Sequence, residues 1–335
     1  MQPRVFVGRS LPGPALGRLR ESTDVEVWEA GEPPTAQQLA GRCRSVDGLL
    51  AMLTDTVDED LLASCPKLRV VSNFAVGFDN LDIAALTRRG IPAGNTPGVL
   101  TDSTAELTMA LILASARRLI EARDAVLAGE WRHWSPQFLL GRDLAGATLG
   151  IVGYGRIGEA VARRALAFDM RVLVTSRTPR EAEGVEWVNL EELLRRSDIV
   201  SVHVNLAHAT RQLIGVAELS LMRPGAVLVN TSRGEIVDPR ALFEALASGH
   251  LAGAGLDVTE PEPIPLDDPL LGLANCIVLP HIGSATLATR SKMADLAVEN
   301  LLAGLAGRRL PHCVNPEVYG PDETPPPAAG ATPLD

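Results

Sequence analysis

The stretch TLGIVGYGRIG, residues 148–158, places a G-x-G-x-x-G turn between an apolar run and a helical pattern. Gly153 allows a tight turn, Gly155 lets the backbone approach a pyrophosphate, and Gly158 lets the helix pack closely against its strand. The N-terminus of that helix offers unpaired N–H groups to phosphates. A glycine-rich turn without a ligand is the alternative, and the flanking strand and helix patterns disfavour it. The stretch therefore predicts a dinucleotide site.

The end of the next strand, residues 175–180, reads TSRTPR and predicts the type of dinucleotide. An NAD site usually carries Asp or Glu there to bind the ribose 2′-hydroxyl. This segment has no carboxylate, and its two arginines suit a 2′-phosphate because the guanidinium group forms a fork of donors. We therefore expect NADPH as the cofactor, with NADH possible. The alternative is that Arg177 and Arg180 are ordinary solvated charges.

Short apolar runs alternate with helical patterns on both sides of the turn. The expected strands are Val5–Val7, Val25–Trp28, Gly48–Leu53, Leu68–Asn73 and Ile91–Gly94, then Thr148–Val152, Val172–Ser176, Ile199–Val204, Ala226–Asn230, Gly253–Val258 and Cys276–Leu279. Helical patterns lie between them, for example Thr35–Cys43 and Leu81–Arg89. The alternation predicts an α/β protein with parallel sheets.

Two long helical patterns set the expected domain boundaries. Residues 103–106, STAE, form a capping-box signature that predicts a helix running to about Arg123, apolar on more than one face and so buried between domains or against a second subunit. A second helix, from Ala285 to about Ala306, is expected to return to the first domain. We expect residues 1–98 with 287–319 to form one discontinuous domain, residues 99–286 a second, and residues 320–335, rich in Pro and Ala, a disordered tail.

The bulk composition excludes several classes of protein. The net charge of -10 disfavours a nucleic-acid partner held through phosphates. The four cysteines form no C-x-x-C pair and no cluster with histidine, which predicts free thiols and no metal site. No signal-peptide pattern opens the chain, and the most apolar run, Leu107–Ala116, is about half the ~20 residues of a membrane span. We expect a cytoplasmic protein without a membrane partner.

Three later segments follow expected strands, where open α/β sheets bind ligands: NTSRGE at 230–235, GLDVTEPEP at 255–263 and PHIGS at 280–284. Reduction of a carbonyl needs a proton donor, a carboxylate to orient it, and a cation to hold an acid substrate. His281, Glu262 and Arg233 can fill these roles. Each has a plain alternative, because the histidine can be structural, the glutamate a solvated loop residue and the arginine part of a surface ion pair.

Taken together, the motifs resemble those of the D-isomer-specific 2-hydroxyacid dehydrogenases over about residues 4–318. The resemblance rests on AVGFD at 75–79, GYGRIG at 153–158, NTSRG at 230–234, GLDVTEPEP at 255–263 and PHIGSAT at 280–286. Within the family the chain looks most similar to the reductases of glyoxylate and hydroxypyruvate. The implied fold is a pair of doubly wound parallel-sheet domains, Rossmann-like and flavodoxin-like, with a cleft between them.

The resemblance also implies roles for individual residues. Arg233 would bind the substrate carboxylate and carbonyl, His281 would donate the proton, and Glu262 rather than Glu260 would pair with His281. The backbone N–H groups of Val76 and Gly77 would hold the carboxylate. The implied cofactor residues are Gly153, Gly155, Arg156, Ile157, Gly158, Ser176, Arg177, Thr178, Arg180, Asn205, Thr231, Asp257, His281, Gly283 and Ser284.

Among the cofactor residues, Asp257 would hold the nicotinamide carboxamide or lie near the substrate. The resemblance further implies a homodimer through the helix near 103–123. Trp134 could then reach the partner's substrate pocket, although simple packing at the interface explains this tryptophan better.

The leading hypothesis is reduction of glyoxylate to glycolate, or of hydroxypyruvate to D-glycerate. The same chemistry on 2-ketogluconate, a phenylpyruvate-like acid or another 2-keto acid is an alternative. A more distant one is a nucleotide-sensing corepressor on the same fold, which the complete set of Arg233, Glu262 and His281 disfavours.

Overall fold

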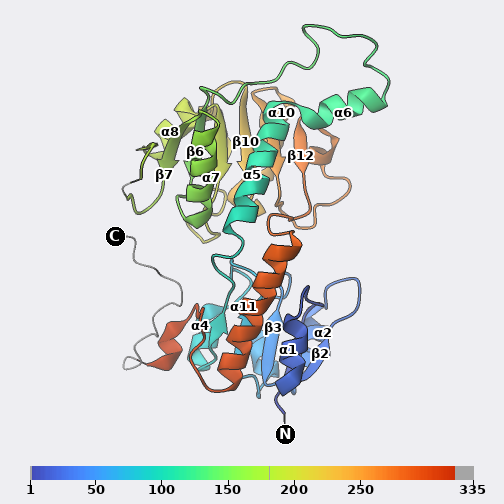
Figure 1. The fold of residues 1–335 in the computed structure, drawn as a ribbon, viewed down its shortest axis with the longest axis vertical. Helices are drawn as coiled ribbons and strands as arrows, with labels where there is room; N and C mark the ends of the chain where they lie inside the picture. The colour runs from blue at the N-terminus through green and yellow to red at the C-terminus, as the bar shows by residue number, and fades with distance from the viewer. Residues whose placement is uncertain (1, 181, 321–335) are drawn as a thin grey trace. The chain divides into compact units, whose positions relative to one another are not determined.

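The computed structural model describes residues 2–180 and 182–320 (Figure 1). The chain forms two compact units: one takes residues up to 100 and from 285 onward, and the other takes residues 101–284. Apart from Gly320, the predicted disordered tail lies outside the described residues. Within the described ranges, no helix is both long enough and apolar enough to cross a membrane.

The first unit is built on a five-stranded parallel sheet in the order β2-β1-β3-β4-β5. Its strands are β1 (Arg4–Val7), β2 (Asp24–Val27), β3 (Gly48–Ala51), β4 (Val70–Asn73) and β5 (Ala93–Gly94). Its helices are α1 (Ala15–Ser22), α2 (Ala36–Cys43), α3 (Glu59–Ser64), α4 (Ile83–Arg88) and α11 (Leu287–Leu305). This strand order is that of the flavodoxin-like doubly wound fold, and all five predicted strands are present.

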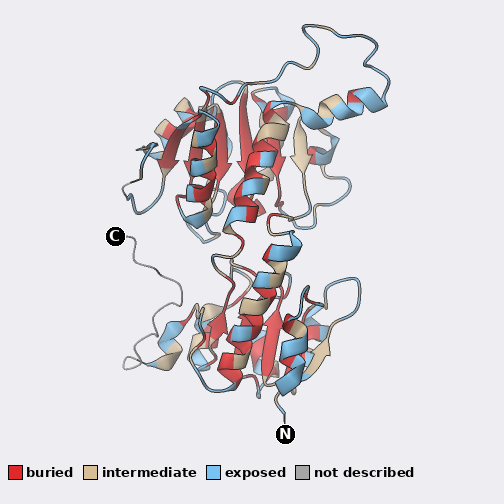
Figure 2. Ribbon diagram, viewed as in Figure 1, coloured by how far each residue is buried: buried red, intermediate tan, exposed pale blue. Residues whose placement is uncertain are grey.

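Alternate residues of these strands supply two cores. On one face, Phe6, Leu49 and Val71 pack with side chains of α2, α3 and α4. On the other face, Val5 and Leu50 pack with α1 and α11. Because both faces are covered, the central strands β1, β3 and β4 are almost entirely buried, whereas the edge strand β2 carries Asp24 and Glu26 and is at most partly buried. Figure 2 shows the sheet buried and the outer faces of the helices exposed.

The second unit contains a seven-stranded parallel sheet in the order β12-β11-β10-β9-β6-β7-β8. Its strands are β6 (Thr148–Val152), β7 (Arg171–Thr175), β8 (Val185–Trp187), β9 (Ile199–Val202), β10 (Ala226–Asn230), β11 (Leu251–Leu256) and β12 (Cys276–Val278). Its α-helices are α5 (Thr101–Ala116), α6 (Leu119–Leu127), α7 (Arg156–Ala167), α8 (Leu190–Arg196), α9 (Val216–Leu221) and α10 (Pro239–Ala247). The order is Rossmann-like, and it reverses between β6 and β9.

Helices cover both faces of this sheet. On one face α5 and α7 lie side by side, with α7 over β6 and β7 and α5 over β10 and β11 (Figure 1). The core on the other face includes side chains of α8, α9 and α10. Strand β8 was not predicted, because its three residues lie at the sheet edge and only partly buried.

The prediction of one helix from Ser103 to about Arg123 is wrong. Helix α5 begins at Thr101, so Ser103 lies inside the helix rather than at its cap, and α5 ends at Ala116. Arg118 adopts a left-handed conformation with φ of 53°, which breaks the helical path before α6 starts at Leu119. Eight of the sixteen residues of α5 are buried, and the helix packs within its own unit against β10, β11 and α7.

Candidate active site

The glycine-rich turn follows β6 at the point where the strand order reverses. Gly153 has a φ of +102°, and a Cβ there would lie 2.6 Å from the backbone of His203, which follows β9. A Cβ on Gly158 would lie 2.2 Å from the carbonyl oxygen of Gly153. Both positions therefore require glycine, one for the turn and one for close helix packing.

Gly155 is different, because a Cβ there would meet nothing within 4 Å. Space is therefore open beside this residue, which is the N-cap of the twelve-residue helix α7 and offers no side-chain cap. The first N–H groups of α7, including those of Arg156 and Ile157, have no partner within their own helix. Open space and unpaired N–H groups at a helix N-terminus fit the pyrophosphate of a nicotinamide dinucleotide.

The segment after β7 is exposed, with Ser176, Arg177 and Thr178 all at the surface. Arg180 is held on both sides: its Nη2 lies 2.6 Å from Oε2 of Glu159, and its guanidinium lies 5.2 Å from the ring centre of Tyr154. Tyr154 in turn makes an edge contact with Trp187. The two arginines therefore differ, since Arg177 makes no ion pair within the described residues while Arg180 already has one.

His281 and Glu262 lie together in the second unit. Nδ1 of His281 is 2.7 Å from Oε1 of Glu262, and about a quarter of the histidine side chain and a third of the glutamate side chain are exposed. An ionised Glu262 accepts a hydrogen bond from Nδ1–H of His281, which leaves Nε2 as the ring atom that can exchange a proton with a substrate. His281 has a φ of 54°, an uncommon backbone conformation for a residue other than glycine.

Asp257, at the end of β11, holds the turn that carries His281. Its Oδ1 accepts the N–H of Ile282 and its Oδ2 the N–H of Gly283, each at 2.7 Å. Its carbonyl oxygen accepts the N–H of His281 at 3.0 Å. The residue is 1% exposed, and burial raises the pKa of its carboxyl above the ordinary value while the two N–H groups oppose this. Each carboxylate oxygen thus holds one backbone N–H of the turn and keeps a second lone pair for another donor.

Arg233 lies in a turn that follows β10. The side chain of Asn230 fixes this turn, because its Nδ2 donates to the carbonyl of Arg233 at 2.8 Å and its Oδ1 accepts the N–H of Ser232 at 3.0 Å. A Cβ on Gly234 would lie 1.9 Å from the carbonyl oxygen of Thr259. The segments that carry Arg233 and Glu262 are therefore pressed against each other, and only glycine fits between them.

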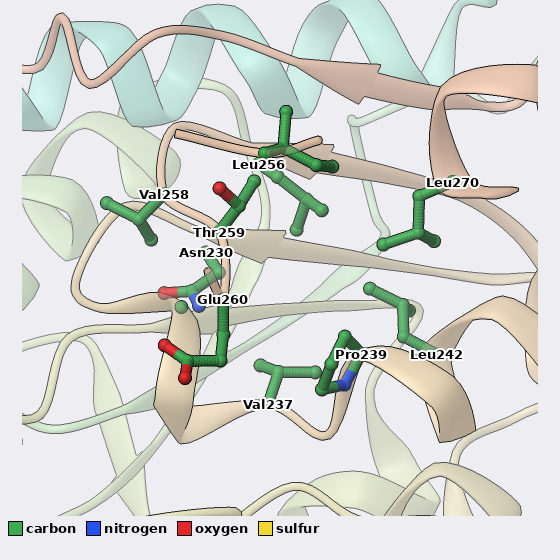
Figure 3. A pocket seen from close by; sticks show the side chains of 11 residues that line it. Asn230, Val237, Pro239, Leu242, Leu256, Val258, Thr259, Glu260 and Leu270 are labelled. Atoms are coloured by element: carbon green, nitrogen blue, oxygen red, sulfur yellow. The ribbon is translucent and has the colours of Figure 1, made fainter. Parts of the chain in front are cut away.

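A small cavity lies beside this contact (Figure 3). Asn230, Thr259 and Glu260 line one part of it, and apolar side chains such as Leu242 and Leu256 line the rest. Its volume of about 20 Å³ is room for about one water molecule. The cavity is thus too small to be the substrate site. Glu260 lines this cavity, whereas Glu262 and His281 do not.

The remaining predicted residues differ in burial and in the unit to which they belong. Thr231 is buried and its hydroxyl lies 2.9 Å from that of Thr108 on α5, while Thr104 donates a long bond of 3.4 Å to the carbonyl of Gly283. Neither α5 threonine was predicted from the sequence, because their contacts come from segments more than 100 residues away. Asn205 is exposed after β9, and Ser284 is half-buried. Val76 and Gly77 belong to the first unit, after β4.

Comparison with known proteins identifies the family. Residues 109–283 match the family described as "D-isomer specific 2-hydroxyacid dehydrogenase, NAD binding domain". The chain belongs to this family. It is 48% identical over 323 residues to a glyoxylate reductase of Korarchaeum cryptofilum, covering 95% of this chain and 97% of the relative. A glyoxylate reductase of Aeropyrum pernix is 50% identical over 325 residues, with 95% and 97% covered.

The fold agrees with that of a solved relative. The crystal structure of a protein from Thermus thermophilus matches with a TM-score of 0.89 and 49% identity, covering 93% of this chain and 99% of that one. The predicted fold class, two parallel-sheet α/β domains of doubly wound topology, is confirmed. The protein is a D-2-hydroxyacid dehydrogenase that binds a nicotinamide cofactor.

Proposed function

We propose that this dehydrogenase reduces glyoxylate to glycolate and hydroxypyruvate to D-glycerate. The observation that carries the proposal is the pair formed by His281 and Glu262, with 2.7 Å between Nδ1 and Oε1. The unit that holds this pair also carries the dinucleotide turn at Gly153. The glyoxylate reductases of Korarchaeum cryptofilum and Aeropyrum pernix, at 48% and 50% identity, support the choice of substrate.

The proposed chemistry uses the residues of the second unit in separate roles. The bound cofactor supplies a hydride to the keto carbon. His281 donates a proton from Nε2 to the keto oxygen, while Glu262 orients the ring and balances its positive charge. Arg233 binds the carboxylate and polarises the carbonyl through its fork of donors. Asp257 keeps the turn of His281 in place, and we assign to the same carboxylate the nicotinamide carboxamide of the cofactor.

The first unit is proposed to bind the substrate carboxylate. We assign this role to the domain of residues 1–98 and 287–319, through the N–H groups of Val76 and Gly77, and cofactor binding to residues 99–286. Two N–H groups aimed at one anion form charge-assisted hydrogen bonds, which are stronger than neutral ones.

Steady-state kinetics on glyoxylate, hydroxypyruvate, pyruvate and 2-ketogluconate, each with NADH and with NADPH, test the proposed activity. We expect the highest kcat/KM with glyoxylate or hydroxypyruvate. A preference for 2-ketogluconate would keep the chemistry and overturn the proposed substrate. Absence of turnover with every acid would overturn the reductase assignment and favour a nucleotide-sensing role.

We further propose that NADPH is preferred over NADH, and that Arg177 is the main reason. The change Arg177→Asp removes a cation and places a carboxylate where it can accept from a ribose 2′-hydroxyl. We expect the ratio of kcat/KM for NADPH to that for NADH to fall by about 10-fold or more, since a charged hydrogen bond is worth about 1.5–3 kcal/mol. Kinetics with saturating glyoxylate measure the ratio.

Arg171 provides the matched control for this change. It is an exposed arginine at the start of β7, the same strand that leads into Arg177 at its other end. Arg171→Asp alters the net charge equally and should leave the cofactor ratio as in the wild type. If Arg177→Asp also leaves the ratio unchanged, the proposed role of Arg177 is wrong.

A homodimer is proposed for the assembled enzyme. Eight of the fifteen exposed large apolar side chains among the described residues fall between positions 119 and 140, on α6 and the chain after it. Trp131 is 61% exposed and Trp134 79%, and apolar surface concentrated in this way marks an interaction site. We therefore propose that the contact with a second copy of the chain, predicted for residues 103–123, extends to residue 140. Sedimentation equilibrium measures the oligomeric state, and we expect a dimer.

A further inference from the structure

The loop after β4 has three consecutive carbonyl groups that are each fixed by a hydrogen bond. The carbonyl of Ala75 accepts the backbone N–H of Thr96 at 2.9 Å. The carbonyl of Val76 accepts Nδ2 of Asn95 at 2.7 Å. The carbonyl of Gly77 accepts Nδ2 of Asn73 at 2.9 Å. Two of the three donors are therefore asparagine side chains.

A fixed carbonyl also fixes the N–H group of the residue that follows it. In a planar trans peptide the C=O and the N–H of one unit point in opposite directions. The bond from Thr96 to Ala75 therefore turns the N–H of Val76 away from Thr96. In the same way, the bond from Asn95 to Val76 turns the N–H of Gly77 away from Asn95. The N–H groups of Val76 and Gly77 therefore both point away from the groups of Thr96 and Asn95 that hold the preceding carbonyls.

These two N–H groups have no acceptor among the residues that the structure describes. Val76 and Gly77 are both partly exposed, and adjacent N–H groups in such a loop form an anion-binding concavity. We infer that Asn95, assisted by Asn73, is a positioning residue that holds this loop ready for the carboxylate of the 2-keto acid. The inference rests on the proposed role of Val76 and Gly77.

The two asparagines are held rigidly themselves. Asn95 is 8% exposed, its backbone carbonyl accepts Nδ2 of Asn300 at 2.9 Å, and its N–H donates to the carbonyl of His312 at 3.1 Å. Asn73 is fully buried and exchanges amide hydrogen bonds with Asn80 at 2.9 and 3.2 Å. Preorganised donors of this kind spare the substrate the cost of ordering the loop.

Asn80 extends the frame to a third segment. Its Nδ2 lies 3.0 Å from the carbonyl of Met52 and 2.9 Å from that of Asp55, both in the loop after β3. The 73–80 loop is therefore tied to the ends of β3 and β5 as well as to its own strand. Loss of one donor should loosen the loop without unfolding the unit.

The test compares Asn95→Asp and Asn95→Ala with the wild type. Aspartate keeps the size of asparagine and removes the donor, so it replaces an attraction for the carbonyl of Val76 with a repulsion. We expect the KM for glyoxylate and the Kd for oxalate, measured by calorimetry on the enzyme loaded with NADPH, to rise about 10- to 100-fold in the Asn95 variants. The Kd for NADPH should stay at its wild-type value, and kcat should change less than KM.

Asn315 supplies the matched control. It is a fully buried asparagine of the same unit, and it bonds the N–H of Ala93, the carbonyl of Ile91 and the hydroxyl of Thr87. Asn315→Ala should lower the Tm at least as much as Asn95→Ala while leaving the KM for glyoxylate and the Kd for oxalate unchanged.

Two outcomes separate this inference from the proposed function. Wild-type KM and oxalate affinity in both Asn95 variants, or a rise no larger than in Asn315→Ala, would overturn the positioning role while the reductase assignment stands. If the wild type binds oxalate but does not reduce glyoxylate, the proposed substrate fails, and the oxalate affinities of the variants still decide the role of Asn95.

Discussion

Replacing His281 with alanine should lower kcat for glyoxylate by about 10²- to 10⁴-fold, the range that positioned proton donors contribute. The imidazole is the group that pairs with Glu262 at 2.7 Å, and alanine leaves the developing alkoxide without a proton donor. The turn itself should persist, because Asp257 binds the N–H groups of Ile282 and Gly283 rather than the imidazole. Stopped-flow or steady-state oxidation of NADPH measures the loss.

Two measurements make this prediction specific. The Kd for NADPH, from fluorescence titration, should stay within about threefold of the wild type, since the glycine-rich turn is unaffected. Glu262→Gln keeps a hydrogen-bond acceptor for Nδ1 but removes the negative charge, so its kcat should fall less than that of His281→Ala. A wild-type kcat in His281→Ala would show that the proton comes from another group.

Much of the fold was predictable because the decisive signals are local. The central strands β3, β10 and β11 are largely apolar runs of four to six residues, and burial on both faces makes such runs nearly continuous. The helical pattern predicted at residues 35–43 is helix α2, Ala36–Cys43, and the structure shows Thr35 as its N-cap in a capping box with Gln38. The turn at Gly153 marked the first strand of a Rossmann unit, whereas the order of the strands in each sheet comes from the structure.

The break between α5 and α6 was not predictable from local signals. Arg118 carries the left-handed conformation without glycine, asparagine or proline to mark it. The apparent capping box at Ser103 also misled, because the sequence STAE fits a helix interior as well as a helix start. Tertiary packing of α5 against β10 and β11 overrides the local pattern.

The candidate site was predictable by residue type and less so by role. The segments that carry Arg233, Glu262 and His281 stand at strand ends, which the sequence shows. Asp257 holds the turn of His281 through hydrogen bonds to residues that lie 25 and 26 positions further along the chain. The bond from Asn95 to Val76 likewise spans 19 residues, so neither contact has a signal in the local pattern.

Replacing Arg233 with alanine should lower kcat/KM for glyoxylate by about 10³-fold or more. The proposed site uses one guanidinium to bind the carboxylate and to stabilise negative charge on the keto oxygen, and loss of one such donor alone costs about 10²–10³ in rate. Because binding and charge stabilisation both depend on Arg233, KM should rise and kcat should fall together. Initial rates over a wide range of glyoxylate concentrations separate the two effects.

Arg233→Lys and Arg240→Ala are the matched controls for Arg233→Ala. Lysine keeps the positive charge but lacks the planar fork, so Arg233→Lys should recover part of the KM and little of the kcat if bidentate geometry matters. Arg240 is an exposed arginine on α10 in the same unit, and its removal should leave both constants unchanged. Equal activity in Arg233→Lys and the wild type would mean that charge alone suffices. Asn230 holds the backbone carbonyl of Arg233, so neither Arg233→Ala nor Arg233→Lys should move the turn. The loss of kcat/KM in these two variants therefore reports on the guanidinium itself.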